Sequence, residues 1–120
     1  MQKQHEVMQW IMELLSTMEE GLVYIRQKMI QGMTMEPINM FYDVTAAFLK
    51  IEQALAGLAI EKVNIQEKAG KLRHALDVIT EEYESNKGKR ALEIMQLNLE
   101  PAFKGWKEEI EKIIIKAAGH

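Results

Sequence analysis

The stretch that decides the fold is residues 8–29, MQWIMELLSTMEEGLVYIRQKM, where apolar residues recur at alternating steps of three and four. The residues that share this spacing are Met8, Ile11, Leu15, Met18, Leu22, Ile25 and Met29. Steps of three and four match the 3.6-residue turn of an α-helix and place these side chains on one face. A β-strand would alternate at every second residue, so the stretch predicts an amphipathic helix.

Three later segments repeat this apolar spacing. The second stripe consists of Phe41, Val44, Phe48, Ile51, Leu55 and Leu58. The third consists of Ile65, Ala69, Leu72, Leu76, Ile79 and Tyr83. The fourth consists of Leu92, Met95, Leu99, Phe103, Trp106, Ile110, Ile113 and Ala117. We therefore expect an all-α fold, an antiparallel up-down-up-down four-helix bundle whose stripes share one interior, as a single domain over residues 1–120.

Residues that end or start helices lie between the stripes. They are Gly32, Thr34, Pro37, Asn64, Asn86, Gly88 and Gly119. Gly32 is suited to end a helix in the left-handed conformation. Asn64, with Glu67 three residues later, is typical of an N-cap and its capping box. The helices predicted from this punctuation are approximately 3–31, 36–60, 65–86 and 89–118.

The fourth segment is irregular around Pro101. Its spacing slips to two successive steps of four across Met95, Leu99 and Phe103. A four-residue skip turns an apolar stripe around the helix. Proline removes one backbone hydrogen bond and clashes with the carbonyl of residue Leu97, which kinks a helix. We expect one helix kinked near Pro101; the alternative is a full break near Asn98, which would then cap a new helix.

Composition limits the classes of partner and compartment. The chain has a net charge of −3 and no cysteine, so disulfides and thiolate metal sites are excluded. The acidic balance argues against nucleic acid and against a membrane surface as partners. A short basic cluster, Lys87, Lys89 and Arg90 around Gly88, is more typical of a helix end followed by a helix start than of a phosphate site. With no signal peptide and no apolar span, we expect a cytoplasmic protein.

Catalytic and metal-binding patterns are weak. None of His5, His74 and His120 follows a Glu at the spacing of di-iron bundles, and the nearest pattern is His74 with Asp77. Two Glu-x-x-Glu pairs occur, and these are Glu81 with Glu84 and Glu108 with Glu111. Such pairs can hold Mg²⁺, as in all-helical nucleotide pyrophosphohydrolases, but on the heptads all four carboxylates face water. We expect no catalytic residue, no metal site and no cofactor.

Apolar side chains away from the stripes are more informative. The six that we single out as a candidate partner-binding set are Trp10, Val23, Tyr24, Ile30, Tyr42 and Leu49. An exposed apolar band commonly marks a partner surface, although an imperfect bundle could cover the same residues. Eight of the nine methionines lie in residues 1–40, and flexible thioethers suit both core gaps and adaptable surfaces. The methionines that the stripe leaves free are Met12, Met33, Met35 and Met40.

One segment resembles a known family. Tyr42-Asp43 is followed after four residues by Phe48-Leu49, and Trp106 lies in the last predicted helix. This pattern resembles the flagellar export chaperones of bacteria, small helical bundles that hold a secreted flagellin segment, although Val44 replaces the glycine usual after Tyr-Asp. The resemblance covers less than a tenth of the chain and implies a grip on an unfolded partner through apolar grooves.

These observations lead to two functional hypotheses. The first is a non-enzymatic protein-binding or self-associating bundle, an adaptor or a secretion-chaperone-like protein. The alternative is a Mg²⁺-dependent all-helical nucleotide phosphohydrolase that uses the paired Glu residues.

Overall fold

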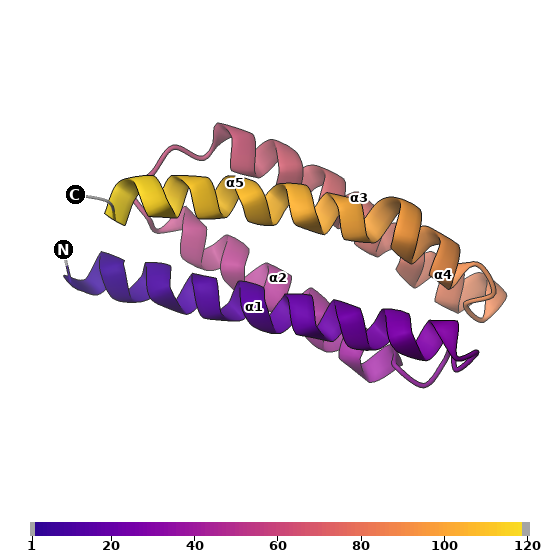
Figure 1. Ribbon diagram of the computed structural model, residues 1–120. Helices are drawn as coiled ribbons and strands as arrows, with labels where there is room; N and C mark the ends of the chain where they lie inside the picture. The colour runs from indigo at the N-terminus through magenta and orange to yellow at the C-terminus, as the bar shows by residue number, and fades with distance from the viewer. Residues whose placement is uncertain (1, 119–120) are drawn as a thin grey trace.

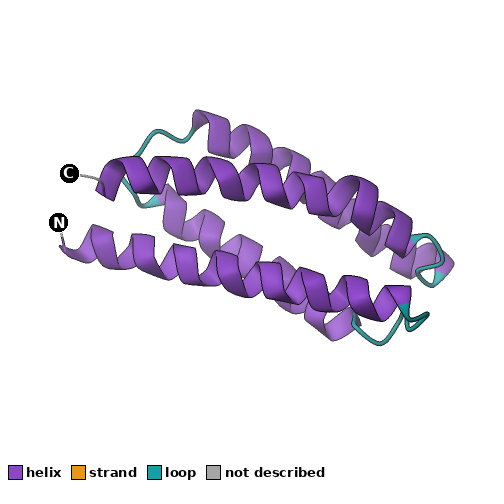
Figure 2. Ribbon diagram, viewed as in Figure 1, coloured by secondary structure: helices purple, strands orange, loops and turns teal. Residues whose placement is uncertain are grey.

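The computed structural model describes residues 2–118, and these residues form helices joined by short loops (Figure 2). The elements are α1 (Gln2–Ile30), α2 (Ile38–Ala56), α3 (Val63–Asn86), α4 (Ala91–Ile94), the π-helical η1 (Met95–Leu99) and α5 (Glu100–Ala118). The last three follow one another without a gap, so residues 2–118 hold four long helical segments and no strand. The prediction of an all-α fold with four helices is confirmed. Gly119 and His120 lie outside the described residues.

The helices lie side by side in an elongated body of 47 × 21 × 18 Å (Figure 1). The start of α1 and the end of α5 lie at one end of this body, and loops 31–37 and 87–90 lie at the other (Figure 1). The closest backbone packing is between α1 and α2 and between α3 and α5. At Gly21 a methyl group would lie 2.9 Å from Val44 Cγ2, so α1 and α2 approach closely because this position lacks a side chain.

The core consists of the predicted stripes. Every residue of the first three stripes is buried, Leu58 included, although Leu58 lies beyond the end of α2. The fourth helix adds Trp106, which is completely buried with its ring centroid 5.0 Å from that of Phe48 and 6.2 Å from that of Phe103. Burial of such side chains typically contributes about 1.5–3 kcal/mol each before entropy is subtracted. The stripes were therefore a reliable guide to the interior of α1, α2 and α3.

The fourth helix departs from the predicted stripe in two places. Before Pro101 the backbone forms η1, in which the N–H of Glu100 donates to the carbonyl of Met95, five residues earlier. A π-helical turn holds one extra residue. It accommodates the slip in spacing without interrupting the helix, and the alternative of a break near Asn98 is therefore wrong. Ala91, Ile94 and Met95 are buried around this turn, whereas Leu92 is only half-buried.

The second departure lies near the end of α5. Ile114 is buried in place of the predicted Ile113, which is half-buried, and Ala117 is exposed. An ideal helix drifts by about 20° in each heptad, so a strict seven-residue pattern moves off the buried face over several turns. The step of four from Ile110 to Ile114 corrects this drift.

Helix ends agree with the prediction around Gly32, at Asn86 and at Ala118, whereas the end of α2 and the start of α3 differ from it. Gly32 has φ +86°, its N–H donates to Met29 O at 3.0 Å, and Met33 N–H donates to Lys28 O at 2.9 Å. These two bonds form the Schellman motif that closes a helix on a left-handed residue. α2 ends at Ala56 rather than at residue 60, because the chain turns at Gly57.

The predicted N-cap at Asn64 is wrong. α3 already begins at Val63, so Asn64 lies inside its first turn. The N–H of Val63 donates instead to Glu61 Oε1 at 3.3 Å, which means that a carboxylate two residues upstream satisfies a free helix donor.

Replacing Gly32 tests the left-handed closure of α1. Gly32→Ala is expected to lower the free energy of unfolding by about 1 kcal/mol or more, because alanine is strained at positive φ. Gly57→Ala is the matched control, since Gly57 has φ −87° and an added methyl group meets only ordinary contacts. Urea unfolding measures both; equal stabilities for the two variants would contradict the assignment.

Candidate interaction surfaces

All six candidate partner-binding residues are exposed, with between 38% and 58% of each side chain accessible. They do not form one site. Trp10 lines a hollow between α1 and α2, whereas Val23 lines a different hollow between α1 and α5. The ring of Tyr24 lies under Lys28 Nζ at 5.6 Å, and Ile30 is the last residue of α1. The sequence thus identified exposed apolar side chains but not how they are grouped.

The residues that carry the chaperone resemblance divide between surface and core. Tyr42 and Leu49 on α2 are both about half exposed, at 54% and 51%. Phe48 and Trp106 are buried and pack against each other. Only the first two are therefore available to a partner.

The hollow around Trp10 has an apolar lining and a polar rim. Its volume is about 520 Å³. Its lining consists of Lys3, Gln4, Val7, Trp10, Gln53, Ala54, Gly57 and Leu58. Gln4 Oε1 accepts a hydrogen bond from the backbone N–H of Ala59 at 3.4 Å, which ties the start of α1 to the turn after α2. The lining thus combines the exposed Trp10 ring with the apolar residues Val7, Ala54 and Leu58.

The hollow around Val23 is lined by charged side chains that form ion pairs with one another. Arg26 Nε lies 2.9 Å from Glu100 Oε2, and Lys107 Nζ lies 3.1 Å from Glu111 Oε2 and 3.7 Å from Glu19 Oε1. The hydrogen bond to Glu111 raises the pKa of Lys107 above its ordinary value. This hollow of about 380 Å³ is therefore bridged by ion pairs between α1 and α5.

The two Glu pairs occupy separate places. Glu108 and Glu111 line the charged hollow between α1 and α5, where Glu111 is bound to Lys107. Glu81 and Glu84 are exposed on α3, and Glu81 lines another hollow, next to Arg90. Within residues 2–118 no group of three or more His, Asp or Glu side chains is arranged to hold a metal ion.

A further hollow, of about 680 Å³, lies between α3 and the η1–α5 region. Its lining includes His74, Lys71 and Lys68 on α3 and Leu97, Asn98 and Pro101 on the opposite side. The small residues Gly70, Ala75, Ala102 and Gly105 leave it open. Asp77, paired with His74 in the sequence pattern, is not among the residues that line it. π-Helical turns are frequent at functional sites, so η1 distinguishes this groove from the others.

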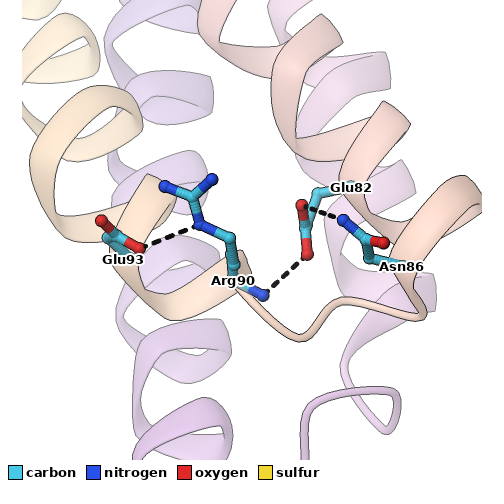
Figure 3. Close-up of polar contacts among 4 residues, drawn as sticks. All are labelled: Glu82, Asn86, Arg90 and Glu93. Atoms are coloured by element: carbon cyan, nitrogen blue, oxygen red, sulfur yellow. Dashed lines mark hydrogen bonds and ion pairs between the residues drawn. The ribbon is translucent and has the colours of Figure 1, made fainter.

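Glu82 is the one buried charged side chain within residues 2–118, and sequence reasoning missed it in favour of its exposed neighbours. It reaches from α3 across the turn to the fourth helix (Figure 3). Its carboxylate accepts hydrogen bonds from Asn86 Nδ2 at 3.2 Å and from the backbone N–H of Arg90 at 2.7 Å. A carboxylate at the start of a helix accepts a hydrogen bond from a free backbone N–H group, and its negative charge interacts favourably with the positive end of the helix dipole. Its position at the edge of the stripe, beside Tyr83, was the only signal in the sequence.

The same turn is joined to loop 31–37. The Tyr83 hydroxyl donates to Thr34 O at 2.9 Å. A methyl group at Gly88 would lie 2.7 Å from Thr34 Cγ2 and 2.9 Å from the Tyr83 ring, so only glycine fits there. Gly88 also has φ +77°. These contacts hold two loops that are about fifty residues apart in the sequence against each other.

Comparison with known proteins gives a family. The model of a family described as a domain of unknown function, DUF8042, matches residues 6–109, a span that includes parts of all four helical segments. This chain belongs to the DUF8042 family. No curated protein and no solved structure matches it. The surfaces of this DUF8042 chain are therefore the features that bear on its function. No helix within the described range is long and apolar enough to cross a bilayer.

Tyr83→Phe tests the contact between the two loops. Burial raises the pKa of Tyr83 from 10.0 to about 12. Below pH 10 the phenol is neutral in both states, whereas between about pH 10 and 12 the unfolded chain ionises first, so stability falls as pH rises. At neutral pH we expect Tyr83→Phe to lower the free energy of unfolding by about 1 kcal/mol.

The measurement is urea unfolding of both proteins across this pH range. The wild type is expected to lose more stability than Tyr83→Phe on the alkaline side, so that the difference between them shrinks. Parallel pH curves would contradict a buried, hydrogen-bonded phenol.

Proposed function

We propose that this chain is a non-enzymatic protein-binding bundle, adaptor-like or secretion-chaperone-like, which holds an apolar segment of a partner protein or of a second copy. The observation that carries the proposal is Trp10, whose indole is 43% exposed beside the apolar hollow between α1 and α2. Tryptophan is enriched among the residues that dominate binding energy at protein interfaces.

The chemistry of the partner follows from the exposed face of α1. Trp10, Thr17 and Tyr24 are spaced by seven residues and therefore lie in one column along the helix. Exposed Glu6, Glu13 and Glu20 form a second column with the same spacing. A helix laid along α1 would meet two aromatic rings with a column of carboxylates along one side. We therefore propose an amphipathic partner segment with an apolar centre and basic flanks.

We also propose the directions of the four helices and the shape of the fourth. An antiparallel up-down-up-down bundle, with its fourth helix kinked near Pro101, is supported by the position of the loops in Figure 1 and by the π-helical turn before Pro101. The resemblance to flagellar export chaperones favours the same type of partner. The absence of cysteine is in keeping with a cytoplasmic role.

A matched pair of surface variants tests the proposal. Trp10→Ser removes the proposed anchor, which is 43% exposed, and Ile115→Ser removes a more exposed apolar side chain, at 64%, from α5. Because both positions are exposed, we expect both variants to unfold at the same urea concentration as the wild type. Proteins retained by the immobilised wild type would be identified, purified and titrated against all three chains, and sedimentation velocity would report self-association.

We expect Trp10→Ser to weaken the wild-type interaction, with a partner or with a second copy, by about tenfold or more, and Ile115→Ser to leave it unchanged. A wild type that stays monomeric at every concentration and binds no purified candidate would overturn the proposal. Equal affinities for Trp10→Ser and the wild type would overturn the assignment to the α1–α2 hollow.

A further inference from the structure

The exposed side of α1 carries a second regular stripe, which we call the outer α1 face. Its residues follow one another in steps of four and three, and they are Glu6, Trp10, Glu13, Thr17, Glu20 and Tyr24. All six are exposed. The three carboxylates of this face form no ion pair within residues 2–118. The outer α1 face therefore offers two aromatic rings together with three unpaired negative charges.

The hollow between α3 and the η1–α5 region, which we call the α3–α5 groove, has the reverse charge. The titratable residues that line it all come from α3, and they are Glu67, Lys68, Lys71 and His74. Neither lysine forms an ion pair within the described residues. The opposite wall is uncharged and consists of Leu97, Asn98, Pro101, Ala102 and Gly105. One wall is therefore mainly basic, and the other includes Leu97, which is 69% exposed.

The other carboxylates on the neighbouring turns of α3 and α5 do not line this groove. They are Asp77, Glu81, Glu100, Glu108 and Glu109. Glu100 and Glu108 line the charged hollow between α1 and α5, and Glu81 lines a different hollow. Glu109 Oε2 lies 3.3 Å from Lys112 Nζ. The two lysines of the α3–α5 groove thus face one lining carboxylate, Glu67.

The spacing of charges on the two surfaces corresponds. At a rise of 1.5 Å per residue, Glu6 and Glu13 lie about 10 Å apart along α1, with Trp10 between them. Lys68 and His74 lie about 9 Å apart along α3. A methyl group at Gly105 would lie 3.6 Å from Lys68 Cδ, so the Lys68 side chain extends towards α5. The groove volume of about 680 Å³ is within the range of about 300–1,000 Å³ that is typical of ligand pockets.

The two surfaces belong to different helix pairs. α1 packs most closely on α2, and α3 on α5 (Figure 1). Trp10 lines the hollow between α1 and α2, whereas no residue of α1 or α2 lines the α3–α5 groove. One chain therefore carries two surfaces of complementary charge that do not meet within the molecule. Complementary charge across an interface favours association and sets its specificity.

We propose that the outer α1 face of one molecule docks in the α3–α5 groove of a second copy. Trp10 enters the groove beside Leu97, and Glu6 and Glu13 pair with the lysines of α3. This proposal rests on the proposed function and names its partner. Because the two surfaces differ, the contact is head-to-tail, and each dimer keeps one free face and one free groove. Further copies therefore add to the dimer until a ring closes or a filament grows.

Sedimentation velocity of the full chain over a range of concentrations tests the proposal. The face variant is Trp10→Ser/Glu13→Gln, and the groove variant is Leu97→Ser/Lys71→Gln. Their control is Ile115→Ser/Lys116→Gln, which makes the same changes as the groove variant at exposed positions outside both surfaces. Urea unfolding of all three checks that they are folded, since substitutions at exposed positions typically change stability little.

We expect the wild type to form dimers and larger species as its concentration rises, and to do so less at high salt because the contact is charged. The face variant and the groove variant should each associate about tenfold more weakly or less, and the control should behave as the wild type does. Association of the groove variant equal to that of the wild type would overturn the proposal. So would a wild type that stays monomeric at low salt.

Mixing the two variants gives the sharpest test. The face variant keeps an intact groove, and the groove variant keeps an intact face, so one contact can form between them. We expect an equimolar mixture to give a dimer that does not grow further. A mixture that stays monomeric would contradict head-to-tail docking.

Failure of this proposal can be told apart from failure of the proposed function. A wild type that is monomeric but binds another purified protein through Trp10 overturns only the second copy as partner. A wild type that is monomeric and binds no purified protein overturns both.

Discussion

The structure depends on one constraint: each of four helices carries an apolar stripe that must be removed from water, and only the other three stripes can cover it. Burying these stripes sets how each helix is rotated about its own axis. That rotation decides which side chains remain outside. Trp10 is exposed because Ile11 is completely buried, and Leu49 is exposed because Phe48 is buried. Every surface discussed above is a consequence of that shared interior.

Much of the interior could be predicted from spacing alone, because helical periodicity is a local property. The stripe of α1 was correct from Met8 to Met29, whereas the stripe of the fourth helix was wrong at Leu92, Ile113 and Ala117. Spacing cannot say how a helix absorbs a slip, and here a π-helical turn did so. Glu82 could not be assigned either, because its partner is the backbone of a residue beyond a turn. Which exposed residues lie together could not be predicted from the sequence either, because it depends on which helices are neighbours in the fold.

The exposed apolar surfaces differ in shape and in chemistry. The hollow at Trp10 is concave, is formed by two helices and lies beside a column of carboxylates, which suits an amphipathic helix with basic flanks. Met33 and Met35 are exposed at the end of the bundle where Gly88 lies close to Thr34.

The central claim is that the shared interior brings loops 31–37 and 87–90 to one end of the bundle. Because the chain has no cysteine, spin labels can be placed at Met33→Cys and Lys89→Cys, both exposed, without background. The distance between the two labels by pulsed electron paramagnetic resonance should be a single narrow distribution, well below the 47 Å length of the molecule. A distribution centred near that length, or one as broad as that in urea, would contradict the account.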